Sequence, residues 1–477
     1  MRPRSFSFPL VVAASLPAFI VLQPLADSRA AKAFAADATP DEATRLTLDL
    51  LSRDDADFRA IGLERVRYGI KGAAATGVFA ALLPTLPAAR QAELVSALAD
   101  RGDHAALPAV LALLDSTADA GVKAACLAAV GAVGSAEEVP RLVRSLAADG
   151  AEQEATRRGL MRLQGPDVNA RITAAQAAAD PGVRARLIEI LADRRARSAL
   201  PTMLAAAVAE SDVVRSSAMQ ALGRLGGPDQ VAGMVQGLLA AAPGGEREAA
   251  ERAVVTVCTR NPGSEKSAAV FLERFKSLPD ADREALVPTL GRVGGAGVLA
   301  LVDGMIADPD AARRKLGLTA LAKWPDATVT QRLLDRLDAA RDDAERDLLL
   351  GALIRIAPLP DNKLDDRQKL DLLKKTMTLC RRDDDRRRVV ERANAIRTID
   401  SLRFVVPYLD DPLLAESACL SVVELAHHRN VRDAHKAEFT QALDKVIGTT
   451  KNAELLERAE RYKNGQTWER KKNPAKG

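Results

Sequence analysis

The stretch that decides the fold is Ser216 to Asp229, SSAMQALGRLGGPD. Its apolar residues return at helical spacing, which predicts a short amphipathic helix. A double glycine, Gly226 and Gly227, ends that helix, and the Pro-Asp that follows can open another one. The stretch therefore predicts a hairpin of two helices joined by a short turn.

Weaker copies of this stretch recur about every 31 residues along nearly the whole chain. We take Leu222, the last large apolar residue before the glycines, as the anchor that aligns the copies. The equivalent positions are Val66, Leu98, Val130, Leu160, Leu191, Leu222, Val257, Leu290, Leu321, Leu353, Ile396 and Val423. The step after Leu353 is long, about 43 residues, and the next is short, about 27. Unrelated helices would not keep such a step, so we interpret the chain as a tandem repeat.

Each period contains two helical segments, which we call A and B. The A segment runs from an acidic start to the anchor, as in Asp119 to Gly131, and the B segment is shorter, as in Val139 to Ala147. Proline stands in the first turn of several B segments, where its missing N–H costs nothing. These prolines are Pro108, Pro140 and Pro201. Each repeat is therefore expected to be an A–B helical hairpin.

Polar and glycine residues predict where these helices begin and end. Asp167 and Asp229 are expected to be N-caps of B helices. Gly134, Gly165 and Gly226 are expected to adopt the left-handed conformation that closes A helices.

One hairpin of this size cannot bury its own apolar face, so neighbouring hairpins must cover it. The sequence thus predicts an all-α fold, an α-solenoid (α-α superhelix) of about twelve stacked helical hairpins. The composition agrees, because 47% of the residues are hydrophobic but only 3% are aromatic, so that small side chains separate thin layers. Pro288 falls inside an A segment and is expected to kink it.

These residues resemble the HEAT repeat superfamily, in particular short HEAT-like repeats of the bilin-lyase type. The resemblance rests on the core Ala221 to Asp229, its copies Ala129 to Gly134 and Gly159 to Asp167, and Pro288 within a helix, and it extends over residues 50–446. It implies that the B helices line a concave face used for partners. It also implies a binding scaffold more often than an enzyme.

The composition of residues 1–35 predicts an export signal. Arg2 and Arg4 form a positive start, Phe8 to Leu22 is an apolar run, and Ala33-Phe34-Ala35 is a small-x-small cleavage site. An uncleaved membrane anchor is the alternative, but the run is shorter than the ~20 residues that span a bilayer. We expect a secreted protein of bacterial type, periplasmic or extracellular after cleavage near Ala35.

The rest of the chain divides by composition. Residues 36–53 are expected to be a linker and lead-in, and 54–356 the regular HEAT-like repeats. A proline-bearing loop at 357–363 interrupts the series, and repeats continue in 357–450. Residues 451–477 predict a C-terminal capping helix and a basic tail with Trp468.

The charge of the chain argues against a nucleic-acid partner. The formal net charge is +4, and Arg2, Arg4, Arg29 and Lys32 against Asp27 place +3 of this in the signal. The mature chain is therefore nearly neutral, with its charges mixed along the sequence.

Few residues are candidates for a disulfide, a metal site or a catalytic site. Of the cysteines Cys126, Cys258, Cys380 and Cys419, only the last two lie near enough in a linear stack to form a disulfide, and whether they pair stays open. Glu424, His427 and His428 are weak candidates for metal ligands, because Glu424 and His428 would share a helix face. The alternative is that these histidines simply end a helix. We found no P-loop or nucleophile elbow, and the sequence calls for no cofactor.

The leading hypothesis is an exported, non-enzymatic scaffold that binds a protein partner through its B helices. Candidate contact residues are polar positions on B segments, together with the tryptophan of the tail. They are Arg141, Arg144, Arg171, Gln236, Arg274, Asp303, Arg332, Asp335, Arg336 and Trp468. One alternative is an enzyme or enzyme-accessory domain resembling bilin lyases. Another is attachment of an envelope protein to an acidic polymer through the basic tail. The sequence leaves the partner and the oligomeric state open.

Overall fold

The computed structural model describes residues 41–260, 264–360 and 363–468. In these ranges the regular structure is helical and contains no strand. The chain forms two compact units, one up to Arg171 and one from Ile172, and the division falls inside α10 (Val168–Ala175). The predicted signal, residues 1–35, and most of the basic tail, 469–477, lie outside the described residues.

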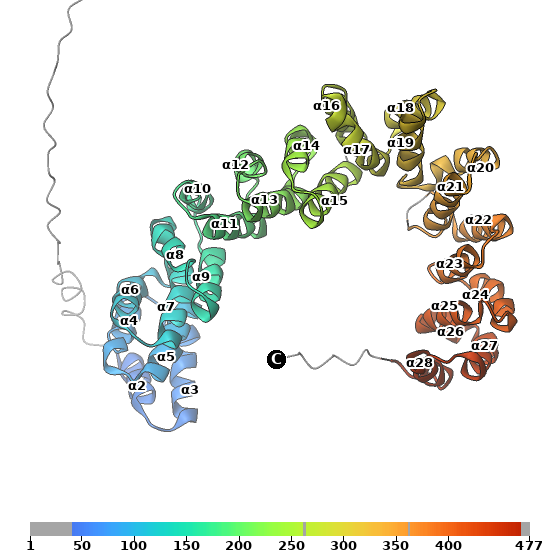
Figure 1. Ribbon diagram of the computed structural model, residues 1–477. Coiled ribbons are helices and arrows are strands. Elements are labelled where there is room, and N and C mark those ends of the chain that lie inside the picture. The colour runs from blue at the N-terminus through green and yellow to red at the C-terminus, as the bar shows by residue number, and fades with distance from the viewer. Residues whose placement is uncertain (1–40, 261–263, 361–362, 469–477) are drawn as a thin grey trace, which may run out of the picture. The chain divides into compact units, whose positions relative to one another are not determined.

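The first unit consists of hairpins whose A and B helices form two layers (Figure 1). The A helices are α3 (Ala56–Glu64), α5 (Ala88–Arg101), α7 (Ala120–Val133) and α9 (Gly150–Arg162). The B helices are α4 (Ala73–Ala80), α6 (Leu107–Ser116) and α8 (Val139–Ser145). A further helix, α2 (Glu42–Ser52), packs against α3 in the part of the chain expected to be a lead-in.

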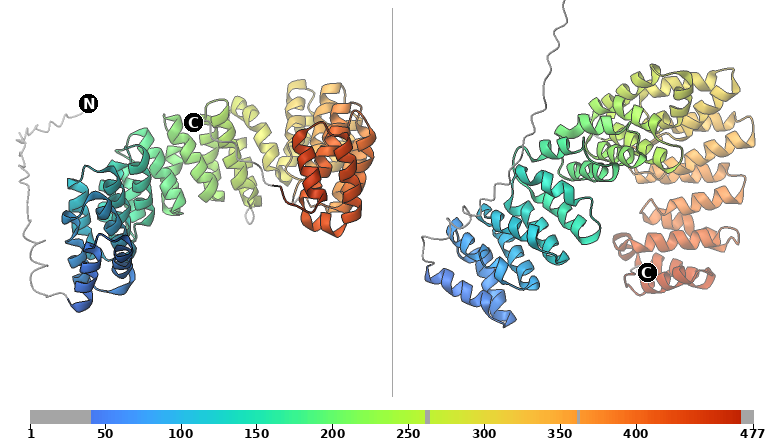
Figure 2. Two further views of the ribbon diagram at one scale, coloured as in Figure 1. Left: turned by 90° about the horizontal axis from the view of Figure 1, so that it is seen from below. Right: turned by 60° about the vertical axis from the view of Figure 1, so that its left-hand side comes forward.

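The second unit, taken by itself, is also built of hairpins whose A and B helices form two layers (Figure 2). Its A helices are α11 (Pro181–Asp193), α13 (Asp212–Leu225), α15 (Gly245–Thr259), α17 (Asp280–Val293), α19 (Ala311–Ala322), α21 (Asp343–Ile356), α23 (Asp383–Ala393), α25 (Ala415–His427) and α28 (Ala453–Lys463). Its B helices are α12 (Leu200–Ala206), α14 (Val231–Ala240), α16 (Ser264–Lys276), α18 (Ala296–Ala307), α20 (Thr330–Asp338), α22 (Asp366–Leu379), α24 (Ile399–Val405) and α27 (Lys436–Thr449), with the short α26 (Arg429–Ala434) before α27. Successive A helices contact one another, so each unit is an α-solenoid of stacked hairpins.

The predicted anchors form the core between the layers. Leu222 and Leu290 are 0% exposed, and every other predicted anchor is buried as well. Burial of these apolar side chains against the next hairpin supplies the main stabilisation of the stack. The anchor period therefore identified the buried row correctly.

One anchor was assigned to the wrong position. Ile396 is buried but lies after the end of α23, so it is not the helical equivalent of Leu222. Val390, inside α23 and fully buried, takes that place. The prediction failed because α23 begins in the charged run Arg381 to Arg388, which lacks an apolar period of its own.

Aspartates cap several of the A helices. The Asp119 carboxylate accepts a hydrogen bond from the Val122 amide at 2.9 Å, and Asp310 accepts one from Arg313 at 2.8 Å. Such caps satisfy amides that have no partner within the helix. Asp229 does not cap α14 as we expected, because a 3₁₀ turn, Pro228–Gln230, precedes that helix. Asp229 instead forms an ion pair with Lys266 at 3.2 Å.

Two of the three predicted left-handed glycines are wrong. Gly134 has φ −91° and Gly226 has φ −65°, and only Gly165 has a positive φ, 126°. Both extended glycines donate their amide to the anchor carbonyl of the preceding helix. A Cβ at Gly134 would lie 2.5 Å from the Val130 oxygen, and one at Gly226 would lie 2.6 Å from the Leu222 oxygen. The glycines are therefore required for close approach to the helix end rather than for a left-handed turn.

Proline positions agree with the sequence. Pro108, Pro140 and Pro201 lie in the first turns of α6, α8 and α12, and Pro288 lies inside α17. At the C-terminal end, the Asn452 side chain caps α28, and Gly465, with φ 72°, follows its last turn. None of the helices in the described ranges has the length and apolar content needed to cross a membrane.

Candidate functional site

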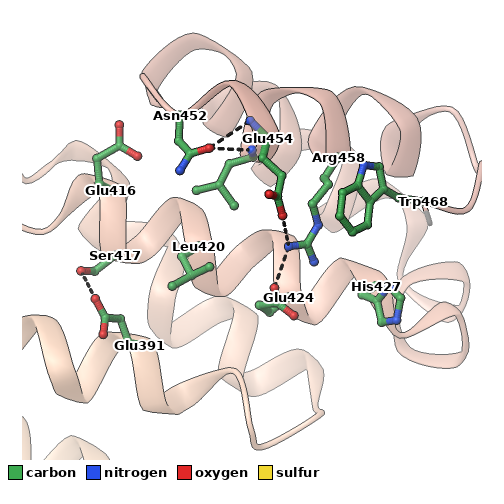
Figure 3. Close-up of a pocket in the computed structure, with 11 residues that line it drawn as sticks. Glu391, Glu416, Ser417, Leu420, Glu424, His427, Asn452, Glu454, Arg458 and Trp468 are labelled. Carbon is green, nitrogen blue, oxygen red and sulfur yellow. Dashed lines mark hydrogen bonds and ion pairs between the residues drawn. The ribbon is translucent and has the colours of Figure 1, made fainter. Parts of the chain in front are cut away.

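A cavity of about 760 Å³ opens on the A-helix layer of the second unit, at α23, α25 and α28 (Figure 3). Most of its lining comes from α25 and α28. The lining residues are Glu391, Glu416, Ser417, Leu420, Glu424, His427, Asn452, Glu454, Leu455, Arg458 and Trp468. Because repeats are stacked, three A helices that are distant in sequence contribute to one site.

Helix α25 presents a single face to this cavity. Glu416, Leu420, Glu424 and His427 are spaced by four, four and three residues, which places them above one another on an α-helix. The opposite side of α25 is apolar and buried, with Cys419 and Val423 fully covered. Burial of the apolar side thus determines which side chains of α25 reach the cavity.

Arg458 stands at the centre of the polar lining. Its Nη1 lies 2.8 Å from Glu424 Oε1 and 3.8 Å from Glu454 Oε1, and the residue is 7% exposed. The guanidinium lies 5.0 Å from the centroid of the Trp468 ring (Figure 3). Burial lowers the pKa of Arg458, but hydrogen bonds to Glu424 and Tyr462 outweigh it and leave the pKa raised. Arg458 is therefore a fixed cation that holds α28, α25 and Trp468 together.

Carboxylates outnumber this cation. The Ser417 hydroxyl donates to Glu391 at 2.7 Å, and the Lys451 amide donates to Glu416 at 2.6 Å. Glu391, Glu416, Glu424 and Glu454 thus give the lining four carboxylates, against the single guanidinium of Arg458. With Trp468 and Leu420 as apolar surface, the cavity combines a surplus of negative charge with an aromatic ring. This arrangement favours a cationic ligand.

The comparisons with known proteins agree with the stacked hairpins. Residues 168–254 match the family described as HEAT repeats. These residues are HEAT repeats. No curated protein matches the chain.

Several solved structures resemble this chain at low identity. Kap121p bound to RanGTP is 10% identical, with a TM-score of 0.41, over 86% of this chain and 57% of its own. A homology model of the full-length AP-3 complex is 11% identical, with a TM-score of 0.36, over 88% of this chain and 92% of that one. Importin beta is 12% identical, with a TM-score of 0.32, over 88% and 72%. This chain thus spans little more than half of the Kap121p chain.

Four of the nine predicted contact residues on the B segments pair with neighbouring repeats. Arg141 pairs with Asp115 of the preceding B helix, and Arg171 pairs with Glu137. Arg332 Nε lies 3.3 Å from Asp303 Oδ2, which joins α20 to α18. These ion pairs link consecutive hairpins, a structural role that the sequence pattern could not distinguish from partner binding.

The other predicted contact residues lie apart from one another on the B helices. Arg144, Gln236 and Asp335 are exposed, and Asp335 accepts a hydrogen bond from Gln331 at 2.7 Å. Arg274 and Arg336 are half-buried, and Arg274 donates to Ser277 at 3.1 Å. Of the predicted set, only Trp468 lines the cavity.

The weak metal candidates are separated by their contacts. Glu424 pairs with Arg458, and His427 Nδ1 lies 2.8 Å from the Tyr462 hydroxyl. His428 follows the end of α25 with ψ 91°, so it leaves the helix face that it would have shared with Glu424. Burial lowers the pKa of His428, and the positive charge of Arg397 adds to this effect. Within the described residues no group of three His, Cys, Asp or Glu side chains is placed to hold a metal.

The cysteines are thiols rather than a disulfide. Cys380 and Cys419 are both free, and the Cys380 thiol donates to the Thr376 carbonyl at 3.3 Å. Cys126, Cys258 and Cys419 are buried, and burial raises the pKa of each thiol to about 12. These three thus behave as small hydrophobic residues.

Most of the cavity was not predicted, because the sequence pattern placed the contact surface on the B helices. Glu391, Glu454 and Arg458 lie instead on the A helices α23 and α28. A usable signal was present in the spacing. Glu391, Glu424 and Arg458 follow one another at roughly the repeat period, so they occupy similar positions on successive A helices.

Proposed function

We propose that this HEAT-repeat protein is a non-enzymatic scaffold that binds a protein partner through a basic segment seated in the cavity of α23, α25 and α28. The observation that carries the proposal is the combination of four carboxylates and Trp468 around one cavity. A lysine or arginine of the partner would pair with the outer carboxylates and lie against the indole ring. Such cation–π contacts contribute about 0.5–2 kcal/mol.

The chemistry of the lining favours binding over catalysis. Ser417 donates a hydrogen bond to Glu391, and His427 is hydrogen-bonded to Tyr462, so the serine and the histidine of this cavity are not paired with each other as nucleophile and base. The bilin-lyase alternative depended on Glu424, His427 and His428 acting as one cluster. Of these three residues, only Glu424 and His427 line the cavity.

Partner binding is expected to depend on Glu454 and Trp468. Glu454 is about half exposed and forms only a 3.8 Å contact with Arg458, so Glu454→Gln with Trp468→Ala leaves the Glu424–Arg458 pair intact. We expect the double variant to bind the captured partner at least ten-fold more weakly in calorimetry, because it loses one charge and the aromatic surface. Raising the salt concentration should weaken wild-type binding.

A matched control is available on α15. Glu248 is exposed and contacts Arg252 at 3.8 Å, so Glu248→Gln removes an equivalent charge far along the chain from the cavity. Capture with crosslinking from native extracts should recover the same partner with this control as with the wild type. Equal recovery by the double variant would contradict the proposed site.

We also propose that the protein is exported and loses residues 1–35. The positive start, the apolar run Phe8 to Leu22 and the small residues Ala33 and Ala35 support this. The intact mass of protein recovered outside the cytoplasm is expected to correspond to an N-terminus near Ala36. Ala35→Arg should block cleavage, whereas Ala38→Arg, beyond the site, should not. A mature protein that retains Met1 would be inconsistent with export by cleavage.

A further inference from the structure

Arginines of A helices, most of them near the C-terminal end of the helix, connect successive repeats in the second unit. Each contacts the preceding A helix, in most cases near its C-terminal end. They include Arg224, Arg260, Arg292, Arg355, Arg392 and Arg458. Helix C-termini leave carbonyls without intrahelical partners and carry partial negative charge, so guanidinium groups are suited to this position.

These arginines are of two kinds. Some find a carboxylate on the preceding A helix, as Arg292 does with Glu251 at 3.1 Å and Arg458 does with Glu424 at 2.8 Å. Others contact only carbonyl oxygens. Arg355 donates to Trp324 at 2.6 Å and to Ala322 at 3.0 Å, and Arg392 lies 3.4 Å from the Arg355 oxygen. The second kind therefore carries charge that no carboxylate of the described chain pairs with.

Two arginines of the second kind meet a third at one place. A cavity of about 340 Å³ between α21 and α23 is lined by Gly351, Ile354, Arg355, Arg388, Glu391 and Arg392. Gly351 leaves the surface of α21 bare there, since a Cβ at this position would lie 3.2 Å from Arg388 Nη2. Arg355, Arg388 and Arg392 thus line one cavity beside a helix surface that carries no side chain at Gly351.

The negative charge nearby does not balance this group. Arg388 has an ion pair with Asp385 at 3.3 Å, and Glu391 accepts a hydrogen bond from Ser417. Arg392 Nε is buried and has no hydrogen-bond partner among the described atoms. A buried donor without an acceptor is unfavourable, and so is positive charge that lacks a counterion. Burial, followed by the charges of Arg292 and Arg392, lowers the pKa of Arg355.

We propose that Arg355, Arg388 and Arg392 form an oxyanion-binding site between α21 and α23, which takes a carboxylate or phosphate group. Guanidinium groups bind such anions in pairs of parallel hydrogen bonds. The anion would supply the negative charge that this cavity lacks. The inference is independent of the protein partner proposed above, because it requires only a small anion.

The test is calorimetric titration of the full chain at constant ionic strength, with two probes. Inorganic phosphate represents a free anion, and a blocked tripeptide containing one glutamate represents a carboxylate carried by a protein. The glutamine form of the tripeptide is its control. Saturable binding of either anion supports the site, and the probe that binds identifies the source. Binding of neither overturns the proposal.

Two variants locate the binding. Arg392→Gln removes one cation, and Gly351→Leu fills the cavity while retaining all three arginines. Each is expected to weaken binding of the probe at least ten-fold. Arg252→Gln, which removes an exposed arginine from α15, should bind as the wild type does. Gly351→Leu tests the site without removing a charge. Unchanged affinity in both single variants, Gly351→Leu and Arg392→Gln, would overturn the assignment.

Discussion

Replacing Leu222 by Ala is expected to reduce the free energy of unfolding by about 2–5 kcal/mol, the cost of a cavity at a fully buried leucine. Leu222 is 0% exposed and lies in the last turn of α13, where its hairpin packs against the next one. Because each repeat is stabilised by its neighbours, the loss should lower the midpoint of urea unfolding for the adjoining repeats.

The control for this variant is on the same helix. Val213 is 52% exposed at the start of α13, so Val213→Ala is expected to change the stability by less than about 0.5 kcal/mol. Circular dichroism during urea unfolding measures both variants. A loss of unfolding free energy below about 1 kcal/mol for Leu222→Ala would show that the row of buried anchors does not supply the main stabilisation of the stacked hairpins.

Adding one methyl group at Gly291 is expected to destabilise the protein by about 2 kcal/mol or more. A Cβ at Gly291 would lie 2.2 Å from the Ala320 oxygen and 2.6 Å from Ala320 Cα, so α17 and α19 must move apart. The contact is with backbone atoms, which cannot rotate away as a side chain does. The gain in helix propensity from Gly to Ala, about 1 kcal/mol, does not offset this clash.

Gly304 gives a control of opposite sign. It lies inside α18, is exposed, and a Cβ there would meet nothing within 4 Å. Gly304→Ala should therefore raise the unfolding midpoint through propensity alone. If Gly291→Ala raised stability as Gly304→Ala does, the close approach of α17 and α19 would not exist in solution.

The close approach of neighbouring A helices at a glycine recurs in several repeats. Gly131, Gly223 and Gly291 each follow an anchor directly in sequence. A Cβ at Gly131 would lie 2.2 Å from the Gly159 oxygen, and one at Gly223 would lie 3.0 Å from the Ala253 Cβ. The sequence pattern predicts glycine at the ends of helices. It does not reveal that a glycine inside an A helix lets the next A helix pack against it.

The ion pairs explain why the predicted binding surface on the B helices differs from the site proposed from the structure. A polar residue on an apolar B segment, such as Arg141 or Arg332, has the same appearance in sequence whether it binds a partner or the neighbouring repeat. The structure pairs both with carboxylates of the preceding B helix. The cavity at Arg458 lies instead among A helices, and its charges come from three separate repeats.

The sequence by itself determined the helical hairpin, its period, the buried anchors, the first-turn prolines and most of the helix ends. These depend on local chemistry, namely apolar spacing, the fixed φ of proline and the capping ability of aspartate and asparagine. Only the tertiary structure decided which charges meet across repeats, where glycine permits contact between backbones, and where the arginines remain without a carboxylate. Such contacts join residues about one repeat apart, and they depend on how closely neighbouring A helices pack, which no local pattern encodes.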